Sequence, residues 1–68
     1  MEDWILLERT ADAARAAIVR GLLEENNVPV VLLNKQDSVY VLLGEIEIYV
    51  PSAFRSLAQS LVSGTLTN

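Results

Sequence analysis

The segment of residues 44–51 constrains the fold of this chain more than any other part of the sequence. Polar or aromatic side chains alternate there with β-branched apolar ones, in the order Glu45, Ile46, Glu47, Ile48, Tyr49 and Val50. A period of two predicts a β-strand with one buried face and one visible face. Pro51 follows directly and is expected to end the strand, because proline cannot donate a hydrogen bond to the ladder.

Residues 10–27 carry the pattern of a helix. Thr10 or Asp12 can cap its start, because a short side-chain oxygen accepts a hydrogen bond from an otherwise unpaired backbone amide. Asn27 is expected to end the helix in the left-handed conformation. Because glycine costs ~1 kcal/mol inside a helix relative to alanine, we expect Gly21 to mark close packing against a sheet. A stripe at helical spacing predicts the buried face, which consists of Ala14, Ala17, Ile18, Gly21 and Leu22 and is widened by Val19 and Leu23.

Two further strands and a second helix complete the predicted elements. Residues 3–9 and 28–35 are apolar on both faces, which is typical of strands that are covered on both sides. Residues 36–38 read as a turn, and residues 39–43 as either a loop or, as we favour, the first half of a long third strand bent at Gly44. The second helix is expected from Ser52, as its cap, to Gly64, with an apolar face made of Phe54, Leu57, Ala58 and Leu61.

The element order β-α-β-β-α predicts a single α+β domain over residues 1–68. A right-handed crossover makes the first two strands parallel, with the third strand between them and antiparallel to both. Both helices then cover one face of the sheet, which is a ferredoxin-like split β-α-β arrangement. Residues 63–68 are expected to be a flexible tail, with a short fourth strand as the alternative.

Composition removes several classes of function. The chain of 68 residues contains no cysteine and no histidine. Disulfides, thiolate or imidazole metal sites, a cysteine nucleophile and the commonest general base are therefore excluded. We predict no catalytic residue, no metal and no cofactor. Self-association is the remaining means of stabilising so small a domain, so we expect a homo-oligomer, with a dimer favoured.

Charge and hydropathy exclude other partners. Nine acidic residues against five scattered basic ones give a net charge of −4, whereas a nucleic-acid footprint needs clustered basic side chains. No apolar run approaches the ~20 residues that a membrane span requires. Glu2 and Asp3 stand where a signal peptide would carry basic residues, so the expected location is the cytoplasm.

The helices can cover only one face of this sheet, so its apolar outer strands must expose large side chains on the other. Such a patch marks an interface more often than it stands bare in water. The sequence leaves open which members are exposed: Trp4 and Leu6 or Ile5 and Leu7 in the first strand, and Val30 and Leu32 or Val31 and Leu33 in the second.

One polar cluster is the candidate for contacts with a small polar ligand or a partner loop. Its members are Asn34, Lys35, Asp37 and Ser38, with Tyr40 and Glu45 nearby. These residue types are also ordinary in a solvated turn, which is the competing interpretation. Glu45 and Glu47, ~7 Å apart on one strand face, form a pair that could serve acid–base chemistry. The favoured interpretation is that Arg9 and Lys35 on the flanking strands neutralise these two carboxylates.

Several segments resemble one family of small bacterial domains, the putative prokaryotic signal-transducing proteins. They are the segments Asn34–Ser38 and Gly44–Val50, together with Tyr40, and upstream Ala14–Glu24 and Val28–Val30. The resemblance spans roughly residues 4 to 62. It implies a fold similar to the nitrogen-regulatory PII proteins and a signalling role, whereas fold similarity alone transfers no ligand.

Two hypotheses for function follow. The first is a non-catalytic regulatory or binding module that acts as a small oligomer. The alternative is a structural interaction domain that self-associates or pairs with a partner protein through its sheet. An enzyme is not expected, because no nucleophile with a neighbouring base is visible in the sequence.

Overall fold

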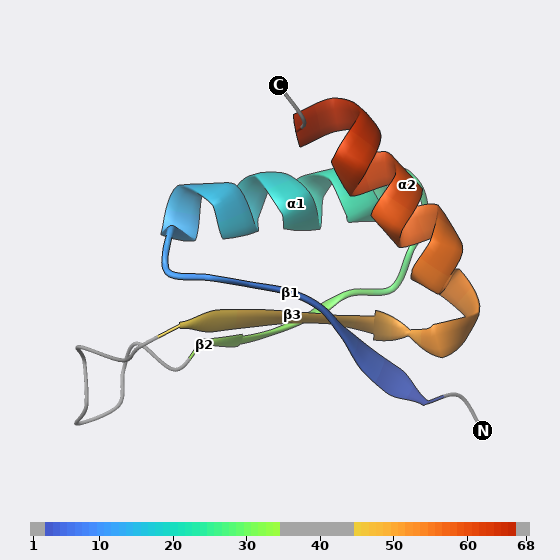
Figure 1. Ribbon diagram of the computed structural model, residues 1–68, viewed down its shortest axis with the longest axis horizontal. Coiled ribbons are helices and arrows are strands. Elements are labelled where there is room, and N and C mark those ends of the chain that lie inside the picture. Colours follow the sequence, from blue (N-terminus) through green and yellow to red (C-terminus); the bar gives the residue numbers. More distant parts are fainter. Residues whose placement is uncertain (1–2, 35–44, 67–68) are drawn as a thin grey trace.

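The computed structural model describes residues 3–34 and 45–66 and has an α+β architecture. Figure 1 shows a three-stranded sheet with both helices on one side of it, as the sequence predicted. The elements in chain order are β1 (Trp4–Thr10), α1 (Ala13–Glu25), β2 (Val31–Asn34), β3 (Ile46–Pro51), the short 3-10 helix η2 (Ser52–Phe54) and α2 (Arg55–Leu66).

The strand order is β1-β3-β2, so the strand with the alternating pattern lies in the middle. Both ladders are antiparallel. The predicted position of the third strand, between the other two and antiparallel to both, is confirmed, and what needs correction is the parallel relation expected for the first two strands, because β1 and β2 share no ladder and no described strands pair in parallel. The described sheet is therefore antiparallel throughout. The expected bent strand over residues 39–43, the turn at residues 36–38 and Gly44 lie outside the described residues.

A β-bulge interrupts the ladder between β1 and β3. Leu6 pairs with Tyr49, but Glu8, two residues further, pairs with Ile48, which directly precedes Tyr49. Leu7 is the extra residue of the bulge, in which two residues of one strand lie opposite a single residue of the neighbouring strand. The bulge turns Glu8 toward the helices, where Arg15 of α1 binds its carboxylate, with Nη2 3.0 Å from Oε1.

The helix α1 is capped at both ends by the residues that the sequence offered. Asp12 is the N-cap, and its Oδ1 accepts hydrogen bonds from the amides of Ala14 and Arg15 at 2.9 and 3.3 Å. Asn27 has a φ of 60°, the predicted left-handed conformation. The amide of the next residue, Val28, donates to the carbonyl of Leu23 at 2.9 Å, which closes a Schellman motif.

The core lies between the sheet and the helices, and its fully buried residues come from every layer. It consists of Ala16, Val19, Leu23, Val28, Ile46, Ile48, Val50 and Ala58. The predicted centre of the buried stripe of α1 is wrong, because Ala14 and Ala17 are exposed and Ile18 is 53% exposed, whereas Val19 and Leu23, which were expected only to widen the stripe, are fully buried. The expectation that Gly21 packs closely against the sheet was also wrong, because a Cβ added at this position would meet no atom within 4 Å.

The second helical segment differs from the prediction at both ends. Ser52 makes no side-chain capping bond; its backbone amide instead donates to the carbonyl of Asp3 at 2.7 Å. The helix α2 continues through Gly64 to Leu66, so the expected tail over residues 63–68 begins inside a helix. A glycine costs helix stability without ending a helix by itself, and a Cβ at Gly64 would meet nothing within 4 Å.

Candidate functional site

The face of the sheet that points away from the helices is the principal candidate site, and we call it the open face. Cross-strand partners share a face, so the pairing places its side chains in three rows. The first row is Trp4 and Pro51. The second row is Leu6, Tyr49 and Val31. The third row is Arg9, Glu47 and Leu33.

Four large apolar side chains of the open face are exposed. The exposed fractions are 48% for Trp4, 36% for Leu6, 42% for Val31 and 45% for Leu33. Their alternates in the sequence, Ile5, Leu7, Val30 and Leu32, pack against the core instead. The structure thus decides the alternatives that the apolar pattern had left open, and it confirms that the sheet exposes large apolar groups.

The apolar residues of the open face enclose a shallow hollow of ≈ 450 Å³. Its lining is contributed by all three strands: Trp4, Val31, Leu33 and Tyr49. Tyrosine and tryptophan combine a large apolar surface with a polar group, and they are enriched where proteins bind one another. The hollow is suited to receive protruding side chains of a partner surface.

A carboxylate lies at the polar end of the open face. Glu47 is only 8% exposed, although it belongs to the solvent-facing side of β3. Arg9 donates from Nε to Oε2 of Glu47 at 3.2 Å, and the hydroxyl of Tyr49 donates to Oε1 at 2.9 Å. The predicted pairing of Glu47 with Arg9 is confirmed. A covered carboxylate needs such partners, because removing one would leave an uncompensated charge.

The electrostatics of this cluster keep Tyr49 protonated. Its hydrogen bond to Glu47 raises the pKa of Tyr49 above the usual 10.0, since a phenolate would face the carboxylate without a proton between them. Burial and the charge of Glu47 act in the same direction, and Arg9 opposes them. Tyr49 therefore acts here as a hydrogen-bond donor that fixes the carboxylate.

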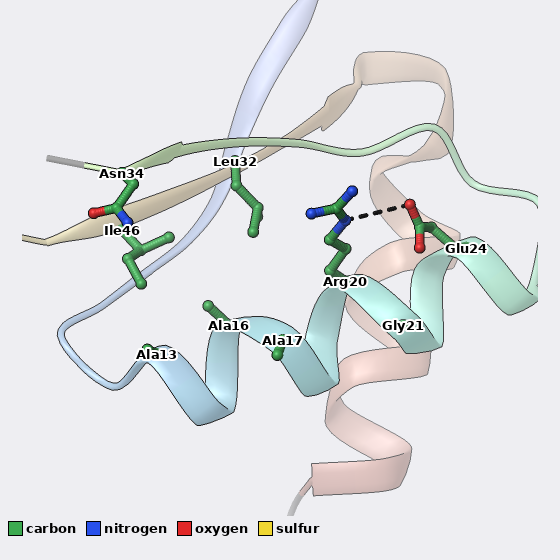
Figure 2. A pocket seen from close by; sticks show the side chains of 9 residues that line it. All are labelled: Ala13, Ala16, Ala17, Arg20, Gly21, Glu24, Leu32, Asn34 and Ile46. Atoms are coloured by element: carbon green, nitrogen blue, oxygen red, sulfur yellow. Dashed lines mark hydrogen bonds and ion pairs between the residues drawn. The ribbon is translucent and has the colours of Figure 1, made fainter.

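A second hollow, of ≈ 320 Å³, lies between α1 and the edge strand β2 (Figure 2). Figure 2 shows the pair Arg20 and Glu24, with 3.3 Å between Nε and Oε2, at one end of it and Asn34 at the other. The other residues that line it are small or apolar: Ala13, Ala16, Ala17, Gly21, Leu32 and Ile46. The room beside Gly21 is part of this hollow, which explains why an added Cβ there meets nothing.

The structure describes only two members of the predicted polar cluster, Asn34 and Glu45. Asn34 is exposed at the end of β2 and lines the second hollow. Glu45 is exposed directly before β3. The other predicted contacts, Lys35, Asp37, Ser38 and Tyr40, lie outside the described residues, so the cluster stays a prediction.

Sequence reasoning missed the hydrogen bond between Tyr49 and Glu47. The signal was present, because residues two apart on a strand share a face.

Within residues 3–34 and 45–66, no group of three or more acidic side chains could hold a metal ion. In the same ranges, no helix has both the length and the apolar content to cross a membrane.

Comparison with known proteins identifies the family. Residues 4–63 match the family described as "Putative prokaryotic signal transducing protein", and the chain belongs to it. The resemblance seen in the sequence is thereby confirmed over nearly the same residues. No curated protein and no solved structure matches the chain significantly.

Proposed function

We propose that this member of the signal-transducing family is a non-catalytic regulatory module that acts as a small oligomer, a reversible dimer formed through the open face. The observation that carries the proposal is the set of four exposed apolar side chains on the open face, with a covered carboxylate at one end of that face. Scattered single apolar residues are normal on a protein surface, whereas a contiguous set on one face supports an interaction site.

The residue types of the open face support a binding role. Trp, Tyr and Arg are the side chains that most often dominate the energy of protein interfaces, and the open face holds Trp4, Tyr49 and Arg9. The absence of histidine and cysteine from the chain supports a module without catalysis. A domain of this size also gains more from a partner than a larger one would.

The size of the open face supports a weak dimer. Three strands at ~4.8 Å spacing, with seven residues at ~3.3 Å rise in β1, give a footprint of roughly 23 by 14 Å, or about 330 Å². A standard interface buries ~800 Å² on each partner. We therefore expect a dissociation constant between micromolar and millimolar. In that range, a modest change in the concentration of the protein or of a competing partner shifts the population of dimers.

Sedimentation equilibrium between about 5 µM and 1 mM tests the proposal, with a matched pair of variants. Leu33 on the open face and Leu57 on α2 are 45% and 46% exposed, so Leu33→Gln and Leu57→Gln remove equal apolar surface from different places. We expect Leu33→Gln to weaken the dimer about tenfold and Leu57→Gln to leave it unchanged. A chain that stays a 7.5 kDa monomer at 1 mM, or equal effects of both changes, would contradict the proposal.

A second candidate is pairing with a partner protein along the edge of β2. In favour of it, β2 is an outer strand of the described sheet, and the hollow beside it leaves room for the side chains of an added strand. Cross-saturation measured by nuclear magnetic resonance separates the two candidates. Edge pairing would affect the backbone amides of β2, and open-face pairing would affect the side chains of its three rows.

The relation to PII proteins is proposed as one of fold alone. In its favour, the order β1-α1-β2-β3-α2 with β3 in the middle is that of a ferredoxin-like half. Small-ligand binding near Asn34 is tested by a thermal-shift screen with nucleotides, amino acids and small acids, because a ligand of the native state raises the melting temperature. No shift with any compound would favour a pure interaction domain.

A further inference from the structure

The order of the side chains in the three rows determines which residues come together when two open faces pack against each other. The orientation inferred from it rests on the proposed dimer. Trp4 and Arg9 both belong to β1, and each lies one row from the middle row that contains Leu6. Rows on one strand face are ~7 Å apart, so Trp4 and Arg9 are separated by roughly 13 Å within a copy. Within one copy, Arg9 binds Glu47 instead of Trp4.

We propose that the open face binds a second copy of this chain about a two-fold axis that runs along the middle row, so that Trp4 of each copy stacks on Arg9 of the other. Such an axis leaves the middle row in place and exchanges the first row with the third. Leu6 then meets Leu6, and the Arg9 end of each face lies over the Trp4 end of the other.

The two side chains are suited to this contact. Trp4 is 48% exposed, and the side chain of Arg9 is 55% exposed. Arg9 uses the Nε edge of its guanidinium to bind Glu47, which leaves the flat face of the group for an aromatic ring. Arginine over the ring of tryptophan is a favourable cation–π contact, and it becomes stronger as water is excluded.

Charge excludes the other simple arrangement. A two-fold axis along β3 would keep each row opposite itself, so that Glu47 of one copy would face Glu47 of the other. Two covered carboxylates brought together in this way repel. The axis along the middle row instead places Glu47 against the row of Trp4 and Pro51. The open face is thus complementary to itself in one of the two orientations.

A double-mutant cycle on dimerisation tests this geometry. The variants Trp4→Leu, Arg9→Met and their combination are compared with the unchanged chain by sedimentation equilibrium. Any coupling within one copy is present in the monomer and in the dimer and therefore cancels, so coupling in the dissociation constant reports a contact across the interface. The dimer contains two such contacts and each substitution is present in both copies, so we expect a coupling of about fivefold to several hundredfold in the dissociation constant, the range for two cation–π contacts.

The outcomes separate the two proposals. A dimer that Leu33→Gln weakens, but in which Trp4→Leu and Arg9→Met act additively, would overturn this geometry and leave the proposed function standing. A chain that never dimerises would overturn both. If Arg9→Met does not fold, because Glu47 loses its ion pair, Arg9→Lys takes its place: it keeps the charge and loses the planar group. Coupling that survives with lysine at half or more of its strength would overturn the stacking.

Discussion

The orientation of α1 is the most direct test of the packing, and two adjacent residues provide it. Val19 is fully buried, and its neighbour Ile18 is 53% exposed. Val19→Ala removes two carbon groups at ~0.8 kcal/mol each, and the space left behind, about 50 Å³, adds ~1.2 kcal/mol. The higher helix propensity of alanine returns ~0.5 kcal/mol. The net loss expected at Val19 is therefore about 2 kcal/mol.

The same estimate gives a smaller loss at Ile18. Ile18→Ala removes three carbon groups that are about half buried, which amounts to ~1.2 kcal/mol. The gain in helix propensity lowers this to about 0.8 kcal/mol. The larger deletion is thus expected to cost less than half as much as the smaller one, because burial outweighs size.

Urea denaturation followed by circular dichroism measures both changes. A chain of 68 residues has a stability of roughly 3–10 kcal/mol, so both variants should remain folded. With a slope near 1 kcal/mol per molar urea, the midpoint falls by about 2 M for Val19→Ala and by less than 1 M for Ile18→Ala. Protein concentration must be held constant, because dimerisation adds to apparent stability. Equal midpoints, or a larger fall for Ile18→Ala, would show that the helix packs with a different face.

Three further changes have defined outcomes. Gly21→Ala should raise the stability by up to ~1 kcal/mol, because the added methyl group meets no neighbour and the helix gains propensity; an unchanged or lower melting temperature would contradict the open space at this position. Asn27→Gly should be neutral or stabilising in urea denaturation and Asn27→Ala should cost ~1 kcal/mol, since φ is 60°; the reverse order would refute the left-handed cap. Because the pKa of Tyr49 is raised in the folded state, the unfolded tyrosine loses its proton first, so the free energy of unfolding falls as pH rises above 10.0. Tyr49→Phe should flatten this fall in urea midpoints measured from about pH 8 to pH 11, and an identical fall in both proteins would count against the hydrogen bond.

The features that sequence reasoning predicted depend on local signals. The alternation around Ile48 identifies β3, because only one strand face can be buried under the helices. Asn27 was predicted in the left-handed conformation because asparagine tolerates it and stands where the apolar pattern of the helix ends. The central position of β3 followed from the crossover rule and the element order.

The orientation of α1 could not be predicted because its sequence contains two apolar stripes. Alanines at positions 13, 14, 16 and 17 leave almost no polar side on the first two turns. The stripe through Ile18 and the stripe through Val19 both have helical spacing. Which one is buried depends on how the chain leaves β1 and how α2 packs against the helix, and neither is local information. Burial of Val19 and Leu23 was decided by tertiary packing.

The candidate site was predictable in its charges and not in its geometry. Opposite charges on neighbouring strands suggested the pair of Arg9 and Glu47, which the structure shows. The exposed set of apolar residues could not be chosen, since the first strand is apolar on both faces. A shift of one residue exchanges the faces of a strand, and only the register of β1 against β3 settles it.

The bulge at Leu7 links the core, the ion pairs and the pattern of the open face. Without the extra residue, the ladder that pairs Leu6 with Tyr49 would continue by pairing Glu8 with Glu47, two carboxylates on one face. Arg9 would then point into the core beside Ile46. With the bulge, Glu8 turns to Arg15 on the helical side, and Arg9 turns to Glu47 on the open face. The same extra residue places Arg9 one row from Leu6, and Trp4 lies one row from Leu6 in the opposite direction. The symmetry that allows two open faces to meet therefore arises from the irregularity that satisfies the charges of a single chain.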